Sequence, residues 1–213
     1  MFKRQFFIFG ASGAYGVGGM NGGWAGLLKQ YIHSALYGEQ GLGEAEEVYN
    51  FAKPGAEISF VLDTFENQLS NYGRECPLSA FLSVGLNDTK AVGNPDTYLS
   101  DETKFEKDYD RLLREMSKNF DSINVLGFYD VDERKVSPKI NSFDGSKSYF
   151  KNDRIHAFNK ILEKVCANYK KVNFIDLSHL SDTWLRDCLF KDGLHPNDKG
   201  HGLIFEKLKS YLR

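Results

Sequence analysis

The stretch Phe6-Phe-Ile-Phe9-Gly10-Ala-Ser12-Gly13, near the start of the 213-residue chain, joins a short apolar run to a glycine-rich turn. Consecutive apolar residues bounded by glycine predict a buried strand. Glycines on both sides of Ser12 free the backbone for a tight turn into a helix. Such a turn presents a hydroxyl and backbone N–H groups at the end of the strand. We therefore predict a strand–turn–helix unit with Ser12 at its corner.

Strand and helix patterns alternate along the rest of the chain. We expect further strands at Glu47–Phe51, Leu78–Val84, Ile123–Tyr129 and Val172–Ile175. Apolar residues at helical spacing predict helices from Trp24 to Leu36 with a stop at Gly38, and over Ile58–Leu69, Phe105–Phe120, Arg154–Tyr169 and Leu203–Leu212. Strands separated by helices are typical of a mainly parallel sheet covered on both faces. The pattern predicts an α/β fold with about five strands, in a single domain over residues 1–213.

Two long segments without regular periodicity, Asp88–Ser100 and Val131–Ser148, each follow a predicted strand. They leave from the carboxyl ends of strands, which is the edge of an open α/β sheet where ligands bind. We expect at least one of them to shape a substrate site, the alternative being a tolerated surface insertion. Tyr98, Tyr129, Tyr149 and Phe150 flank these segments and are candidates for the walls of that site, with packing as their alternative role.

The pentad Asp192-Gly-Leu-His195-Pro196, near the end of the chain, has a carboxylate three residues before a histidine. In a turn, this spacing lets the carboxylate accept a hydrogen bond from Nδ1 of the histidine. The other ring nitrogen, Nε2, is then free to take a proton from a serine hydroxyl. The alternative is that the pentad only begins the last helix, with Pro196 and Asn197 at its start.

Two further turns follow the second and third predicted strands. Gly55 comes after Pro54, and Asn87 stands in Gly85-Leu-Asn-Asp88, where its amide is able to donate a hydrogen bond. Taken alone, each of these is also explained as a connecting turn with no catalytic role. A parallel sheet gathers the carboxyl ends of its strands at one edge, so we expect these turns to meet Ser12. With the pentad they supply a nucleophile, a base, an orienting acid and donors for an oxyanion.

The order of these blocks resembles the SGNH hydrolases, also called GDSL-type esterases and lipases. The resemblance rests on Ser12 after the first strand, Asn50 with Gly55 after the second, Gly85, Asn87 and Asp88 after the third, and Asp192, His195 and Pro196 near the end. Trp24 also resembles the tryptophan often found in the family's first helix. The resemblance runs from about residue 5 to residue 205. It departs from the family at Ala11, where an aspartate is usual, and this departure bears on hydrogen bonding in the first turn.

The resemblance implies a flavodoxin-like, three-layer α/β/α sandwich and an ester hydrolase that needs no metal or cofactor. It implies Ser12 as nucleophile, His195 as base and Asp192 as the residue that orients it. The N–H groups of Ser12 and Gly55 and the amide of Asn87 would form the oxyanion hole. We expect a small-molecule ester as substrate, with a short acyl group on a small polar or carbohydrate compound, cleaved through an acyl-enzyme.

Two other functions compete with this interpretation. Gly10, Gly13 and Gly16 also match the opening of nucleotide-binding Rossmann domains, which would indicate an oxidoreductase. No charged residue suited to a ribose stands at the end of the second strand, Tyr49-Asn-Phe51, and this disfavours that class. The second alternative is a binding module with the hydrolase fold and no activity. His201 lies near the pentad, but no further His or Cys follows at ligand spacing, so we expect no metal.

Composition bounds the location and the partners. The net charge of −2 and the pI of about 6.2 argue against a nucleic-acid-binding protein. Cys76, Cys166 and Cys188 form no CxxC pair, which indicates reduced thiols. No apolar run has the length of a membrane span, and the run after Arg4 is too short for a signal peptide. We expect a cytoplasmic protein, and the sequence leaves its oligomeric state open.

Overall fold

Five parallel strands form the centre of the molecule. The computed structural model describes residues 2–37, 45–141 and 144–212. The strands are β1 (Arg4–Gly10), β2 (Glu46–Asn50), β3 (Leu78–Ser83), β5 (Ser122–Leu126) and β8 (Val172–Ile175). They lie in the order β2-β1-β3-β5-β8, and every neighbouring pair is parallel. This is the strand order of flavodoxin-like doubly wound sheets.

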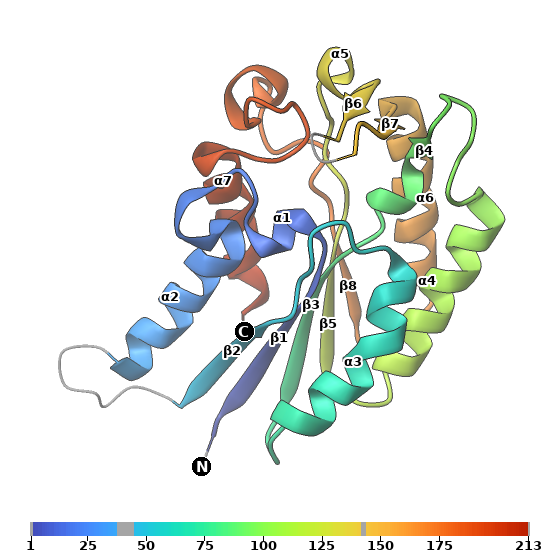
Figure 1. Cartoon of the computed structure of the whole chain (residues 1–213). Coiled ribbons are helices and arrows are strands. Elements are labelled where there is room, and N and C mark those ends of the chain that lie inside the picture. Colours follow the sequence, from blue (N-terminus) through green and yellow to red (C-terminus); the bar gives the residue numbers. More distant parts are fainter. Residues whose placement is uncertain (1, 38–44, 142–143, 213) are drawn as a thin grey trace.

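Helices cover both faces of the sheet (Figure 1). One face carries α1 (Ser12–Tyr15), α2 (Gly23–Tyr37) and α7 (Asp198–Leu208), and the other carries α3 (Ile58–Tyr72), α4 (Glu102–Met116) and α6 (Asn152–Cys166). The predicted three-layer α/β/α fold with a mainly parallel five-stranded sheet is confirmed. Gly38, the expected stop of the second helix, lies outside the described residues.

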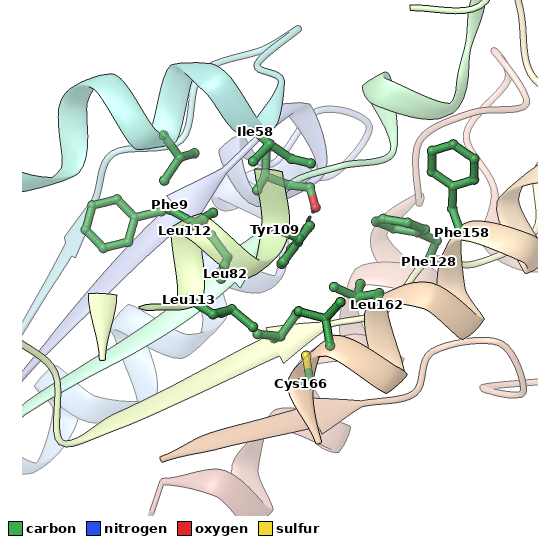
Figure 2. Close-up of a cluster of buried hydrophobic side chains, with 14 of the residues drawn as sticks. Phe9, Ile58, Leu82, Tyr109, Leu112, Leu113, Phe128, Phe158, Leu162 and Cys166 are labelled. Atoms are coloured by element: carbon green, nitrogen blue, oxygen red, sulfur yellow. Dashed lines mark hydrogen bonds between the residues drawn. The ribbon is translucent and has the colours of Figure 1, made fainter. Parts of the chain in front are cut away.

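Successive side chains of the central strand β1 point to opposite sides of the sheet. Because helices cover both sides, the strand is buried on both faces. Phe7 and Phe9 pack in the core under α3, α4 and α6, whereas Phe6 and Ile8 pack in the core under α2 and α7. Figure 2 shows part of the first core, where Tyr109 of α4 points into the cluster. Burial on both faces explains why the strand reads as a continuous apolar run rather than an alternating one.

The strand order reverses next to β1, since the chain adds β2 on one side of it and β3 on the other. Ligands of open α/β sheets bind beyond the carboxyl ends of the strands at such a point. Gly10 ends β1 there, and a Cβ on it would lie 2.5 Å from the carbonyl oxygen of Ser83 and 2.8 Å from the Cβ of Ala14. The missing side chain therefore lets α1 begin close against β3, with Ser12 at the edge of the sheet.

A small antiparallel sheet stands beyond the carboxyl ends of the main strands (Figure 1). Its strands are β4 (Ala91–Val92), β7 (Lys147–Tyr149) and β6 (Lys139–Ile140), in the order β4-β7-β6. The expectation that Asp88–Ser100 and Val131–Ser148 are irregular is therefore wrong: the two segments pair with each other, and the second also contains α5 (Glu133–Val136). Strands of two or three residues are too short to show an alternating pattern. Residues 142–143 lie outside the described residues.

Three helices begin before the residue that their apolar pattern predicts. The helices α4, α6 and α7 start two to five residues earlier than expected, because polar residues form their first turns. The side chain of Asp101 accepts a hydrogen bond from the N–H of Lys104 at 2.7 Å, and that of Asn197 accepts one from Gly200 at 3.0 Å. These are N-caps, which apolar periodicity does not reveal. None of the described helices is both long enough and apolar enough to cross a membrane.

Candidate active site

Ser12 and His195 meet at the carboxyl edge of the sheet although 183 residues separate them. Ser12 is the first residue of α1, and its Oγ lies 2.8 Å from Nε2 of His195. His195 stands just before α7, in a turn closed by a bridge between Leu189 and Pro196. The side chain of His195 is 11% exposed, so little water competes for the contact. The Ser12 hydroxyl therefore has an acceptor for its proton, Nε2 of His195, within hydrogen-bond reach.

The carboxylate of Asp192 holds the other side of the His195 ring. Its Oδ2 lies 2.6 Å from Nδ1 of His195, while its Oδ1 accepts the backbone N–H groups of Leu194 and His195, both at 3.1 Å. Lys139 also donates to Oδ2, at 2.7 Å. Burial by itself raises the pKa of this carboxyl, but the hydrogen bonds from His195 and Lys139 outweigh burial and hold the pKa far below its ordinary value. Asp192 is therefore an anion that fixes Nδ1 as the protonated ring nitrogen.

Asn87 and Gly55 belong to two turns that line the cavity at Ser12. Asn87 begins a short turn after β3, and its Nδ2 donates to the carbonyl of Ala56 at 2.9 Å. An amide nitrogen carries two hydrogens, so one remains for another acceptor. Gly55 has a φ of +81°, which favours glycine, and in the described part of the chain its N–H donates no hydrogen bond. Both residues line the same cavity as Ser12 and His195.

Asp88, next to Asn87, is buried at the N-terminus of α3. The residue is 3% exposed, and its carboxyl oxygens lie 3.3 and 3.5 Å from the backbone nitrogen of Ile58, the first residue of α3. Burial raises the pKa of this carboxyl to about 7, and the charge of Glu57 adds to the increase. Asp88 thus links two segments of the site: the loop that contains Gly55 and the turn that contains Asn87.

The cavity at Ser12 has an open part and a narrow inner part. The open cleft measures about 380 Å³ and lies between Gly55, the small sheet and His195. The inner recess measures only about 30 Å³, and its walls include Val84, Tyr129 and Phe150. Phe150 lines both parts.

The tyrosines expected at this site have three different positions. Tyr129 does line the inner recess, where burial raises the pKa of its hydroxyl. Tyr149 is not among the described residues of the cleft, whereas its neighbours Ser148 and Phe150 are. Side chains alternate along a strand, so these neighbours face the cleft and Tyr149 faces away. Tyr98 does not line the cleft either, and the guanidinium of Arg154 stacks 3.9 Å from the centre of its ring.

His201 is a structural residue of α7. It is 1% exposed, its Nδ1 accepts the N–H of Trp24 at 3.1 Å, and its Nε2 lies 3.1 Å from the carbonyl oxygen of Val17. Burial lowers the pKa of this ring, which keeps it neutral. Both nitrogens are therefore used to hold the loop between α1 and α2. Within the described ranges, no three His, Cys, Asp or Glu side chains are close enough together to hold a metal ion.

Lys139 is a site residue that the sequence did not suggest, and it lines the cleft together with Phe150, which was a candidate wall of the site. Both reach the cleft through the small sheet, whose short strands carry no periodic signal. No local motif connects Lys139 with Asp192, because 53 residues separate them.

Comparison with known families agrees with this geometry. The sequence profile described as GDSL-like Lipase/Acylhydrolase family matches residues 8–203, which is most of the chain. The chain belongs to this family. As a GDSL-like lipase/acylhydrolase it is an ester hydrolase, and the oxidoreductase alternative is set aside. No curated protein matches the chain in sequence closely enough to count as a relative.

Solved structures similar to this GDSL-like hydrolase include three that span nearly all of it. A member of the lipolytic protein G-D-S-L family from Veillonella parvula has a TM-score of 0.70 and 17% identity, covering 98% of each chain. The lipase/acylhydrolase from Enterococcus faecalis has a TM-score of 0.66 and 18% identity, covering 100% of this chain and 98% of the other. An acetyl xylan esterase, AlAXEase, has a TM-score of 0.67 and 19% identity, covering 98% and 100%. At these identities the likeness shows the fold alone.

Proposed function

We propose that Ser12, His195 and Asp192 form the catalytic triad of this ester hydrolase. The single observation that carries the proposal is the unbroken chain of contacts from Ser12 Oγ to His195 Nε2, 2.8 Å, and from His195 Nδ1 to Asp192 Oδ2, 2.6 Å. A serine attacks an ester only when a base takes its proton, and the base needs a partner that fixes its tautomer.

In the first half of the reaction, Ser12 Oγ attacks the ester carbonyl carbon while its proton moves to Nε2 of His195. The carbonyl oxygen becomes an oxyanion, which the N–H groups of Ser12 and Gly55 and the amide of Asn87 stabilise. The second hydrogen of Asn87 Nδ2 supports this assignment, as does the N–H of Gly55, which donates no hydrogen bond within the described residues. The intermediate then expels the alcohol, which takes the proton from His195, and an acyl-enzyme remains on Ser12.

In the second half, water attacks the acyl-enzyme. His195 accepts a proton from this water, and a second oxyanion forms, which the same donors stabilise. When this intermediate collapses, Ser12 takes the proton back from His195 and the carboxylic acid is released. Asp192 stays ionised throughout, which agrees with its strongly lowered pKa. Its charge stabilises the imidazolium that exists in both intermediates.

We propose a short acyl group on a small polar or carbohydrate alcohol as the substrate. The inner recess of about 30 Å³ supports the short acyl group, since a water molecule needs roughly 10–15 Å³ on this measure. An acetyl methyl group fits such a space and a long chain does not. The open cleft has polar side chains, Lys90, Asn141 and Ser148, beside apolar ones such as Pro54 and Ile140, and the polar groups support a polar alcohol.

Fluorophosphonate labelling tests the nucleophile. The probe is expected to label the wild type on Ser12 and to leave Ser12→Ala unlabelled. Ser83→Ala is the matched control, because Ser83 also lines the inner recess but has no histidine contact in the described structure. Labelling that persists in Ser12→Ala, or that disappears in Ser83→Ala alone, would reject Ser12 as the nucleophile.

A series of p-nitrophenyl esters tests the acyl pocket. We expect kcat/KM to be highest for acetate and to fall steeply beyond butyrate. Phe150→Ala should extend the tolerated acyl length, because Phe150 forms a wall of both the recess and the cleft. A wild-type enzyme that prefers octanoate over acetate would contradict the short-acyl proposal.

The remaining expectations on context belong to this proposal. A small-molecule partner, rather than a nucleic acid, agrees with the net charge of −2. A cytoplasmic location is supported by the free thiols of Cys76, Cys166 and Cys188. Fractionation of cells that produce the protein tests the location, and recovery outside the cytoplasm would reject it.

A further inference from the structure

Lys139 brings a positive charge into direct contact with the triad carboxylate. It stands on β6 of the small sheet, and its Nζ lies 2.7 Å from Oδ2 of Asp192. The same oxygen lies 2.6 Å from Nδ1 of His195. One carboxylate oxygen of Asp192 therefore accepts hydrogen bonds from both an ammonium and an imidazole.

The position of this ion pair makes it more than a surface contact. The side chains of Lys139 and Asp192 are 29% and 25% exposed, so water screens their interaction only in part. With two backbone N–H groups on Oδ1, Asp192 has four donors around it. Lys139 is the one donor that carries a permanent full charge.

We propose that Lys139 is a positioning residue for catalysis, which orients Asp192 and sets the pH range in which His195 acts as the base. The inference rests on the proposed triad. The ammonium of Lys139 offsets part of the negative charge that His195 experiences from Asp192. Protonation of the imidazole is thereby opposed, and the neutral form that accepts the serine proton persists to lower pH.

The other ionisable groups around the Lys139–Asp192 pair are either neutral or close to an acidic side chain. Tyr129, after β5, is kept neutral because burial raises its pKa. His201, on α7, is kept neutral because burial lowers its pKa. Lys135 packs against the Asp192 turn at Gly193, and its ammonium lies 3.6 Å from Asp132, which also pairs with Arg134 at 2.9 Å.

The ion pair also ties the substrate cleft to the triad. Lys139 and its neighbour Ile140 line the cleft on the small sheet, whereas Asp192 belongs to the turn before α7. The contact is therefore a direct link between the wall of the cleft and the residue that orients the base.

Lys139→Gln tests the proposal in a pH series of kcat/KM from pH 5 to 9 with p-nitrophenyl acetate, a neutral ester. Removing the charge should raise the midpoint of the acid limb by about 0.5 to 1 pH unit, as expected for a unit charge a few ångströms away in a partly solvated site. The plateau at high pH should change less than about fivefold, since the triad itself is intact. Lys139→Arg should keep the wild-type midpoint.

Lys147→Gln is the matched control. Lys147 is an exposed lysine on β7, the strand paired with β6, and it does not line the cleft among the described residues. The Lys147→Gln substitution removes one positive charge from the same small sheet and should leave the midpoint of the acid limb unchanged. NMR titration of the His195 ring in wild type and Lys139→Gln gives the same comparison without turnover, should the variant be too slow to assay.

The outcomes separate this inference from the proposed triad. A midpoint that rises in Lys139→Gln and stays in Lys139→Arg and Lys147→Gln supports it. A plateau that falls with an unmoved midpoint would show that Lys139 acts only on the fold of the small sheet and would overturn the inference. If the acid limb persists in the residual activity of His195→Ala, the triad proposal fails instead.

Discussion

Replacing Asp88 by asparagine should stabilise the protein at neutral and alkaline pH. Asp88 is 3% exposed, and its carboxyl oxygens lie 3.3 to 3.5 Å from the backbone nitrogen of Ile58, which is a long contact for an ionised group. Burial raises its pKa from the ordinary 3.8 to about 7. Asparagine has the same shape and keeps an oxygen for Ile58, but it has no charge to bury.

The magnitude follows from the pKa values of the folded and unfolded states. Below about pH 4, Asp88 is protonated in both states, and its ionisation has no effect on folding. Between about pH 4 and pH 7 the unfolded chain releases this proton while the folded protein retains it, so the free energy of unfolding decreases as pH rises. Above about pH 7 both states are ionised and the loss is complete. A difference of about three pH units corresponds to about 4 kcal/mol.

Urea unfolding at pH 4, 5.5, 7 and 8.5 measures this difference. The free energy of unfolding of Asp88→Asn minus that of the wild type should be near zero at pH 4, grow through pH 5.5 and level off at about 4 kcal/mol above pH 7. Asp121→Asn is the control, because Asp121 also accepts a backbone N–H, from Leu78 at 2.9 Å, but is exposed. At pH 8.5 this variant should show no gain in stability over the wild type, because an exposed carboxylate has no burial to relieve.

Parallel pH curves for the wild type and Asp88→Asn would refute the reasoning. They would mean that Asp88 ionises as readily in the folded protein as in the unfolded chain, and that the N-terminus of α3 compensates its burial. A variant that is less stable at pH 8.5 than the wild type would lead to the same conclusion more strongly.

The remaining predictions concern the reaction. Asn87→Ala should lower kcat by about 100-fold or more with little change in KM, because its amide donates to a charge that exists only in the transition state; a higher KM with unchanged kcat would make Asn87 a binding residue. The kcat/KM of the wild type should rise with pH through a midpoint of about 6 to 7.5, as neutral imidazole forms; a flat profile would contradict a histidine base. Asp192→Asn should reduce kcat by up to about 10⁴-fold, and His195→Ala by more, measured with the same ester; near wild-type turnover in His195→Ala would leave the pentad as a helix start only. Treatment with EDTA should leave activity unchanged, and a loss restored by added metal would contradict metal-free catalysis.

The sequence by itself determined the main sheet and the residues proposed for catalysis. Apolar runs such as Phe6–Phe9 predict buried strands, and their alternation with amphipathic helices predicts a parallel sheet. Ser12, Asn87 and His195 were identifiable because each stands in a polar turn after a strand or before the last helix. Parallel topology then brings these turns to one edge, whatever the details of packing.

Only the tertiary structure decided how the cleft is built. The strands β4, β6 and β7 are two or three residues long, and they exist because segments far apart in the chain supply each other's hydrogen bonds. Their pairing turns Phe150 toward the cleft and Tyr149 away from it, a choice of face that one residue of register would reverse.

The charges of the site also depend on the whole fold. Asp88 and Asp192 are the same residue type, and both lie within short turns. Folding buries Asp88 with its oxygens 3.3 to 3.5 Å from the backbone nitrogen of Ile58, whereas it surrounds Asp192 with shorter contacts to donors that include Lys139 from the small sheet. The pKa of one therefore rises to about 7 and the pKa of the other falls, because desolvation and hydrogen bonding are set by neighbours that local sequence does not specify.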